Sequence, residues 1–67
     1  MPFNYNKLWK LLIDKGMTKE ALRFKIGASP TTMAKMGKNK NVSLDVIDRI
    51  CKALDCKPED IFEYIKD

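Results

Sequence analysis

The chain has 67 residues, of which 45% are hydrophobic and 33% charged, and it carries a formal net charge of +4. This composition is typical of a soluble globular protein, and the length leaves room for a single domain, residues 1–67. No apolar run approaches the roughly 20 residues that span a bilayer. No signal-peptide segment is present either, so we expect a cytoplasmic protein.

The residue types that most enzymes use are scarce in this sequence. There is no histidine, no glycine-rich phosphate loop, and only two cysteines, Cys51 and Cys56. A zinc site usually needs four Cys or His ligands, and the spacing of these two is not the C-x-x-C of oxidoreductases. We therefore predict no enzymatic activity, no metal and no other cofactor. The cysteines are interpreted as small packing residues, with a redox pair as the alternative.

The charge is unevenly distributed along the chain. Residues 18–41 hold six basic side chains and one acidic one, whereas residues 42–67 hold four basic and seven acidic ones. Within the basic segment, residues 27–41 read "GASPTTMAKMGKNKN", with three lysines and no carboxylate. This asymmetry predicts one face that meets a polyanion. The alternative is a lysine-rich face that is simply solvated.

The first predicted helix runs from about Tyr5 to Lys15. Asn4 is a suitable N-cap, and Gly16 is suited to end the helix. The apolar residues recur with the spacing of one helical face, which predicts that this face packs on a core. These residues are Leu8, Leu11 and Leu12.

The next two predicted helices cover residues 18–26 and 29–37, with a short turn between them. Pro30 occupies the first position of the later helix, where its missing N–H is not needed. Met33 and Met36 are expected to face inward. Hydroxyl side chains are predicted to cap both helices and glycines to end them, namely Thr18, Gly27, Ser29 and Gly37.

The fourth predicted helix starts at Ser43, and the fifth opens at Pro58. One face of the fourth helix is apolar, with Ile47, Ile50, Cys51 and Leu54. The fifth carries Ile61, Phe62 and Ile65. No segment alternates with a period of two for long enough to indicate a strand. We therefore predict an all-α fold of five short helices.

The segment "GMTKEALRFKIGASPTTMAKMGKNKNVSLDVIDRICKALDCKPEDI" resembles the Xre-type, Cro/phage-repressor-like DNA-binding domain. The resemblance rests on the "GMT" start, the "IGAS" turn and the pattern "I-x-x-I-x-x-A-L-x-C" in the fourth helix. It covers nearly all of the chain. It implies that the second and third helices form a helix-turn-helix over about residues 18–37.

In the family that this chain resembles, the third helix enters the major groove of DNA and directs its N-terminal residues at base edges. The resemblance places five residues on that reading face, namely Ser29, Pro30, Thr31, Thr32 and Lys35. Hydroxyl groups donate or accept hydrogen bonds, and lysine prefers the acceptor atoms of guanine. The loop after this helix is expected to contact the sugar–phosphate backbone through Lys38, Asn39, Lys40 and Asn41.

Two positions depart from the family pattern. Lys19 stands where the family often has glutamine, and a lysine there is expected to contact a phosphate. Arg23 stands where the family favours alanine, at the crossing of the second and third helices. Its stem must lie along the crossing with the charge directed outward. Whether the guanidinium contacts a phosphate or pairs with an acidic side chain stays open.

Four apolar residues outside the main stripes have two interpretations. They either pack between the first and last helices and widen a thin core, or they form a homodimer interface. The residues are Trp9, Ile13, Phe62 and Tyr64. A small reading helix recognises only a few base pairs, so we expect the protein to bind two half-sites as a homodimer.

The sequence and this resemblance predict a sequence-specific regulator that binds double-stranded DNA and occupies an operator. Repression is the commoner mode in the family that the chain resembles, and activation is the alternative. Xre-like domains also serve as antitoxins or as protein-interaction modules. A toxin or another protein as the main partner is therefore the alternative function.

Overall fold

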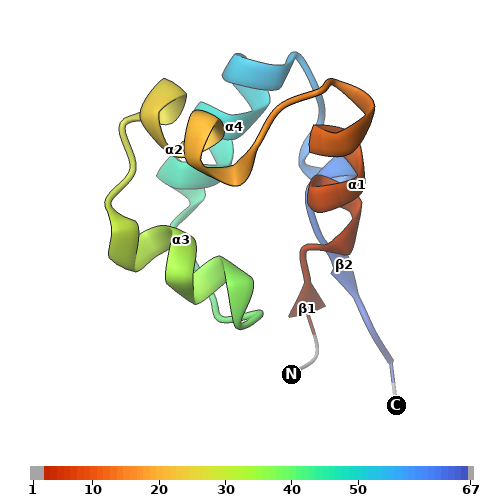
Figure 1. Cartoon of the computed structure of the whole chain (residues 1–67). Coiled ribbons are helices and arrows are strands. Elements are labelled where there is room, and N and C mark those ends of the chain that lie inside the picture. Colours follow the sequence, from red (N-terminus) through yellow and green to blue (C-terminus); the bar gives the residue numbers. More distant parts are fainter. Residues whose placement is uncertain (1–2, 67) are drawn as a thin grey trace.

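The computed structural model describes residues 3–66, which form a mostly helical domain with a short two-stranded sheet (Figure 1). The elements in chain order are β1 (Phe3–Asn4), α1 (Asn6–Asp14), α2 (Lys19–Ile26), α3 (Pro30–Gly37), α4 (Leu44–Leu54), the 3-10 helix η1 (Pro58–Asp60) and β2 (Glu63–Tyr64). Within residues 3–66, no helix has the length and apolar character that a membrane crossing requires.

The predicted caps Thr18 and Ser29 are confirmed, and Ser43, the predicted start of the fourth helix, is a cap as well. The side-chain oxygen of Thr18 accepts a hydrogen bond from the backbone N–H of Ala21 at 3.0 Å. Ser29 and Ser43 accept the corresponding bonds at the starts of α3 and α4, at 3.2 and 3.3 Å. Each bond satisfies one of the N–H groups that a helix start leaves without a partner. These caps fix where α2, α3 and α4 begin.

The start of α1 differs from the prediction by one residue. Tyr5, not Asn4, occupies the N-cap position, because Asn4 belongs to strand β1. The side chain of Asn4 still accepts a hydrogen bond from the backbone N–H of Asn6, at 3.1 Å. Asn4 therefore supports the first turn from outside the helix.

α3 ends at Gly37, as predicted, but Gly37 is not the residue that reverses the chain. Gly37 is the last residue of α3, and the left-handed conformation falls two residues later, on Asn39 with φ 58°. The backbone N–H groups of Asn39 and Lys40 donate to the carbonyls of Met36 and Lys35 at 3.1 and 2.9 Å. This is the hydrogen-bond pattern of a Schellman motif, in which asparagine sometimes replaces glycine.

The predicted fifth helix is wrong beyond its first turn. Only Pro58–Asp60 is helical, as η1, and the chain then straightens into β2. β2 pairs antiparallel with β1, with Phe3 opposite Tyr64 and Asn4 opposite Glu63. Backbone pairing with a distant strand therefore replaces helical hydrogen bonds. Two-residue strands are too short to leave a period-two pattern in the sequence.

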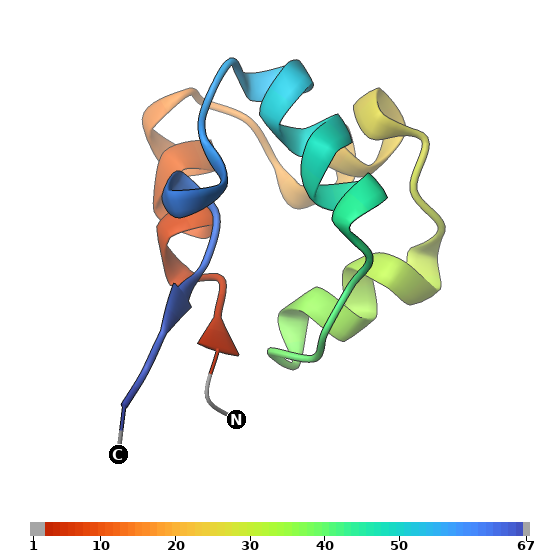
Figure 2. The same ribbon diagram turned by 180° about the vertical axis from the view of Figure 1, so that it is seen from behind.

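The core lies where α1, α2, α4 and η1 converge, and α2 packs against α4 (Figures 1 and 2). Its buried residues are Tyr5, Leu8, Leu12, Leu22, Ile26, Met36, Ile47, Ile50, Leu54 and Ile61. Met36 is fully buried and Met33 is half-buried against the core, which confirms their predicted inward orientation. α3 extends from this core on the side opposite α1, so most of its surface is solvated (Figure 1).

Candidate nucleic-acid interface

The helix-turn-helix consists of α2, the turn at residues 27–29 and α3. Gly27 adopts the left-handed conformation, with φ 68°, that closes α2. Arg49 of α4 donates a hydrogen bond to the carbonyl of Ile26 at 3.4 Å, which supports the last turn of α2. The turn therefore connects two helices whose facing ends are both fixed by hydrogen bonds, from Arg49 at the end of α2 and to Ser29 at the start of α3.

The exposed face of α3 contains three of the predicted residues and one that the sequence reasoning missed. Thr31, Ala34, Lys35 and Lys38 are all exposed and follow one another at intervals of three, one and three residues. This spacing places them along one side of a helix. The missed residue is Ala34. Helical spacing could have placed Ala34 on this face, since it lies three residues after Thr31 and directly before Lys35.

Ser29 and Thr32 lie at the first turn of α3, but their hydroxyl groups already have partners. The two oxygens lie 3.1 Å apart, and the Ser29 oxygen accepts from the Thr32 backbone N–H. Thr32 is half-buried, whereas Pro30 and Thr31 are exposed. Thr31 and Lys35 are therefore the side chains with the most freedom to meet a ligand.

The loop after α3 is attached to the other side of the molecule by one buried side chain. Tyr5, only 4% exposed, donates a hydrogen bond from its hydroxyl to the carbonyl of Lys40 at 2.7 Å. Burial raises the pKa of Tyr5 above its usual value, so the phenol keeps the proton that it donates. The contact joins residues 35 positions apart, so sequence reasoning had no signal for it.

The side chains of this loop are oriented differently from one another. Lys38, Lys40 and Asn41 are exposed, whereas Asn39 is half-buried at the left-handed position. The predicted loop residues are thus brought together on one short connection. Asn39 has a conformational role there, because it adopts the left-handed conformation after α3. This role is separate from its predicted contact with the DNA backbone.

The ion pairs of the described residues leave the predicted DNA-contacting lysines uncompensated. Among residues 3–66, the pairs join Arg23 to Glu20, Arg49 to Asp45 and Lys52 to Asp48. None of them includes the lysines predicted to contact DNA, which are Lys19, Lys35, Lys38 and Lys40. Their positive charges remain available to an anionic ligand.

Arg23 pairs with an acidic side chain, which resolves the question left open by the sequence. Its Nε donates to the Glu20 carboxylate at 2.9 Å, and this hydrogen bond lowers the pKa of Glu20. A second nitrogen donates to the carbonyl of Ala28 at 3.5 Å, and the guanidinium lies 4.3 Å from the ring centre of Phe24. Arg23 therefore neutralises the one carboxylate of the helix-turn-helix.

The four predicted interface residues fall into two groups. Trp9 and Ile13 line one shallow depression together with Lys19, and Phe62 and Tyr64 pack edge-on against Phe3, at 5.9 and 5.2 Å between ring centres. Ile13 is 77% exposed and Tyr64 is 64% exposed, so neither fills the core. The interpretation that they widen the core is wrong for these two side chains.

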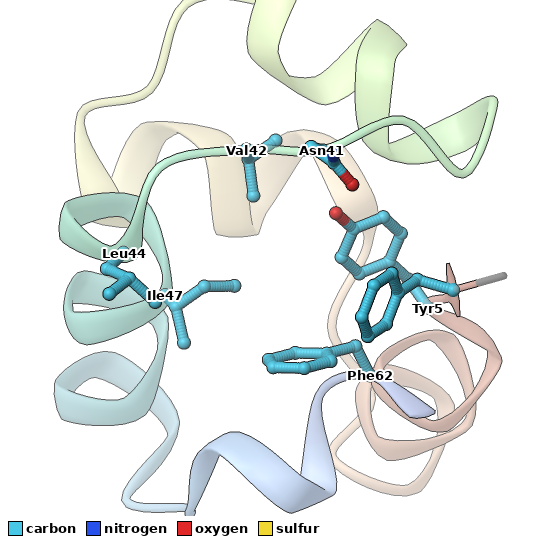
Figure 3. Close-up of a pocket in the computed structure, with 7 residues that line it drawn as sticks. Tyr5, Asn41, Val42, Leu44, Ile47 and Phe62 are labelled. Carbon is cyan, nitrogen blue, oxygen red and sulfur yellow. The ribbon is translucent and has the colours of Figure 1, made fainter. Parts of the chain in front are cut away.

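An apolar hollow of about 150 Å³ lies between β1, the loop after α3 and the start of α4 (Figure 3). Figure 3 shows Tyr5 and Phe62 on one side of this hollow and Val42, Leu44 and Ile47 on the other. Leu44 is 80% exposed. The hollow therefore adjoins both the aromatic group at Phe62 and the basic loop.

The two cysteines are half-buried at the end of α4. The backbone N–H of Cys56 donates to the carbonyl of Cys51 at 3.1 Å, which closes the helix. Burial, with smaller contributions from Cys51 and Asp60, raises the pKa of the Cys56 thiol to about 11. Because the thiolate is the reactive form, Cys56 is a poor nucleophile near neutral pH.

These features, a capped helix-turn-helix with a basic, carboxylate-poor exposed face, define a DNA-binding module. The chain belongs to the Cro/C1-type helix-turn-helix DNA-binding domain family, whose model matches residues 7–67. The resemblance to Xre-type domains is therefore confirmed, and the protein is a helix-turn-helix DNA-binding transcriptional regulator of a non-enzymatic family.

Two known proteins are similar to this chain. One is the uncharacterized HTH-type transcriptional regulator YozG of Bacillus subtilis (strain 168), 36% identical over 59 residues that make up 85% of this chain and 70% of YozG. The other is the transcriptional regulator VanUg, whose crystal structure matches this chain with a TM-score of 0.95 and 52% sequence identity. That match covers 98% of this chain and 88% of the VanUg chain.

Proposed function

We propose that this protein is a repressor that binds an operator as a homodimer and inserts α3 into the major groove. The observation that carries the proposal is the chemistry of the α3 surface. From residue 27 to residue 41 there is no carboxylate, and the lysines of this stretch take part in no ion pair among the described residues. Such a surface attracts the phosphates of DNA and repels none of them.

The proposed interface divides into a reading part and a backbone part. Thr31 and Lys35 would contact base edges, since they are exposed on one face of α3. Ser29, Pro30 and Thr32 would lie at the groove edge, where the capping bonds hold the hydroxyls in place. The backbone part would comprise Lys19, Lys38, Asn39, Lys40 and Asn41.

The homodimer follows from the size of the reading helix. α3 has only 8 residues, so one copy reads few base pairs, and two copies must bind half-sites about one helical turn apart to gain specificity. The exposed apolar side chains Ile13 and Tyr64, with their neighbours Trp9 and Phe62, are the proposed contacts between copies.

The decisive experiment is selection of bound sequences from a pool of random duplex DNA. We expect a pseudo-palindromic site whose affinity falls steeply with salt. We also expect transcription to fall when that site overlaps a promoter and the protein is supplied, and to recover when the site is scrambled. A protein that enriches no sequence and whose retention on DNA does not depend on salt would instead be a protein-interaction module.

The dimer has its own test on the selected site. Two copies per duplex are expected, and Ile13→Lys and Tyr64→Lys, tested separately, identify which apolar group joins them. A footprint over one non-palindromic half-site, with one protein per DNA, would contradict dimeric binding.

A further inference from the structure

Trp9 and Lys19 are in contact, although the sequence places them in different helices and assigns them to different surfaces. The ammonium nitrogen of Lys19, the first residue of α2, lies 4.2 Å from the centre of a ring of Trp9 on α1. A cation at this distance over an aromatic face is attracted to it. The contact therefore holds a long, flexible side chain at one place on the surface.

The two partners have unequal freedom. Trp9 is half-buried, packs against the core and lies beside Tyr5, with 6.4 Å between ring centres. Lys19 is exposed and takes part in none of the ion pairs among the described residues. The indole is thus held in place by the core, and the ammonium group above it has no acidic partner among these ion pairs.

We propose that Trp9 is a positioning residue for DNA binding, which holds the Lys19 ammonium ready for a backbone phosphate at the start of α2. This role rests on the proposed contact between Lys19 and the DNA backbone. A lysine that is already ordered loses less rotamer freedom when it meets a phosphate. The aromatic side chain therefore acts on affinity without touching DNA.

The test is a double-mutant cycle on DNA binding, with the full chain and a fixed duplex. Lys19→Met is expected to lower the salt slope by about one, the value of a single phosphate contact. Trp9→Leu is expected to weaken binding about two- to tenfold, because the Lys19 side chain must then lose its rotamer freedom when the protein binds DNA. In the Lys19→Met background, Trp9→Leu should weaken binding no further, because there is no ammonium left to position.

Two controls separate positioning from folding. Trp9→Phe keeps an aromatic face and should retain most of the affinity. Lys10→Met removes an exposed lysine from the same helix as Trp9 and should leave the salt slope unchanged. Trp9 is the one tryptophan of the chain, so its emission reports the contact directly. We expect the emission to change in Lys19→Met and not in Lys10→Met.

The possible outcomes separate the positioning role from the function on which it rests. If the effects of Trp9→Leu and Lys19→Met simply add, or if Trp9→Phe binds as weakly as Trp9→Leu, Trp9 acts through folding or through the proposed contact between copies, and the positioning role is refuted. If wild-type protein binds DNA but Lys19→Met keeps the full salt slope, the Lys19 contact is refuted. If the wild-type protein binds no DNA, the proposed function itself is refuted, and the positioning role with it.

Discussion

At the scale of single residues, the exposed face of α3 and the loop behind it present similar cations in different settings. Lys35 projects from a capped helix, whereas Lys40 lies in a loop that is held by the hydrogen bonds at the end of α3 and by one from Tyr5. A side chain on a rigid helix can reach a base in a defined geometry, and a charge on a loop suits a phosphate. The two groups should therefore respond differently to mutation.

We predict that Thr31→Ala and Lys35→Ala each cost roughly 1–3 kcal/mol of binding free energy on the selected operator and much less on random DNA. Lys38→Ala and Lys40→Ala should weaken binding to both DNAs and lower the salt slope by about one for each phosphate that is no longer neutralised. Titration of each variant against both duplexes at several salt concentrations measures this.

Lys52→Ala is the matched control, since Lys52 is a lysine whose charge is paired with Asp48 at 3.1 Å. It should change neither affinity nor slope. Loop variants that alter sequence preference while the α3 variants leave it intact would show that the reading surface has been misplaced.

The cysteines allow a prediction about pH. Burial raises the pKa of Cys56 from 9.0 to about 11, so the folded protein favours the protonated thiol. The resulting stabilisation is complete below pH 9 and is lost as the pH rises toward 11, because the unfolded chain ionises first. The free energy of unfolding of wild type should fall over this range more than that of Cys56→Ala.

The same protonated thiol should make Cys56 slow to alkylate at neutral pH, and DNA binding should survive mild oxidation. Cys51→Ala should cost on the order of 1 kcal/mol of stability through poorer packing and leave DNA binding unchanged. Loss of binding on oxidation, restored by a reductant, would support the redox interpretation instead.

At the scale of elements, the part of the fold that the sequence could predict depends on how local each signal is. The caps Thr18, Ser29 and Ser43 act within three residues, so the starts of α2, α3 and α4 were predictable. The apolar face of α4 was equally readable, since helical spacing encodes it. The end of α3 at Gly37 was predicted as well, but the left-handed residue after it lies two positions later, because asparagine competes with glycine for this conformation.

The last segment was mispredicted for a different reason. Pro58 and the acidic residues after it favour a helical turn, and η1 forms there. The extended conformation of Glu63–Tyr64 is instead decided by β1, at the other end of the described chain, through the pairing of Phe3 with Tyr64. For the same reason the contacts of Tyr5 with Lys40 and of Trp9 with Lys19 left no trace in local sequence patterns.

Asn39 provides a test at this scale, because it combines a proposed DNA contact with the left-handed turn that ends α3. Asn39→Gly keeps the turn and removes the amide, and its stability should be close to that of wild type. Asn39→Ala should cost on the order of 1 kcal/mol, because a Cβ without a polar group disfavours this conformation.

Thermal unfolding of both Asn39 variants, followed by DNA titration of each, separates the two roles. If the turn alone matters, Asn39→Gly binds DNA like wild type. If Asn39→Gly is stable but binds weakly, the amide itself contacts the DNA.

At the scale of the whole molecule, the loop that we propose contacts DNA depends on the far side of the fold. The Tyr5 hydroxyl joins the start of α1 to the carbonyl of Lys40, and the Tyr5 side chain lines the hollow that Figure 3 shows. Tyr5→Phe removes this bond and leaves a carbonyl to find another partner. We expect a loss of about 0.5–1.5 kcal/mol in unfolding free energy. Because the loop then loses order, we also expect weaker binding to operator and random DNA alike.

Hydrogen exchange of the amides of residues 38–42 would report the loss of order in Tyr5→Phe directly. Leu8→Ala is a suitable comparison, since Leu8 is a fully buried core residue of α1, the helix that follows Tyr5, and it lies outside the loop. If Tyr5→Phe changes stability but neither loop exchange nor affinity, the loop holds its shape by itself.

The pairing of β1 with β2 has a consequence for how the protein is made. The two strands are the first and last elements of the described chain, and they lie side by side (Figures 1 and 2). Because synthesis runs from the N-terminus, Phe3 is made before Tyr64, and its strand has no partner until Tyr64 has been added. Tyr5 comes directly after that strand and holds the loop at Lys40. A nascent chain therefore carries α2 and α3 before β1 has a partner, and the sheet forms only after the helix-turn-helix has been made.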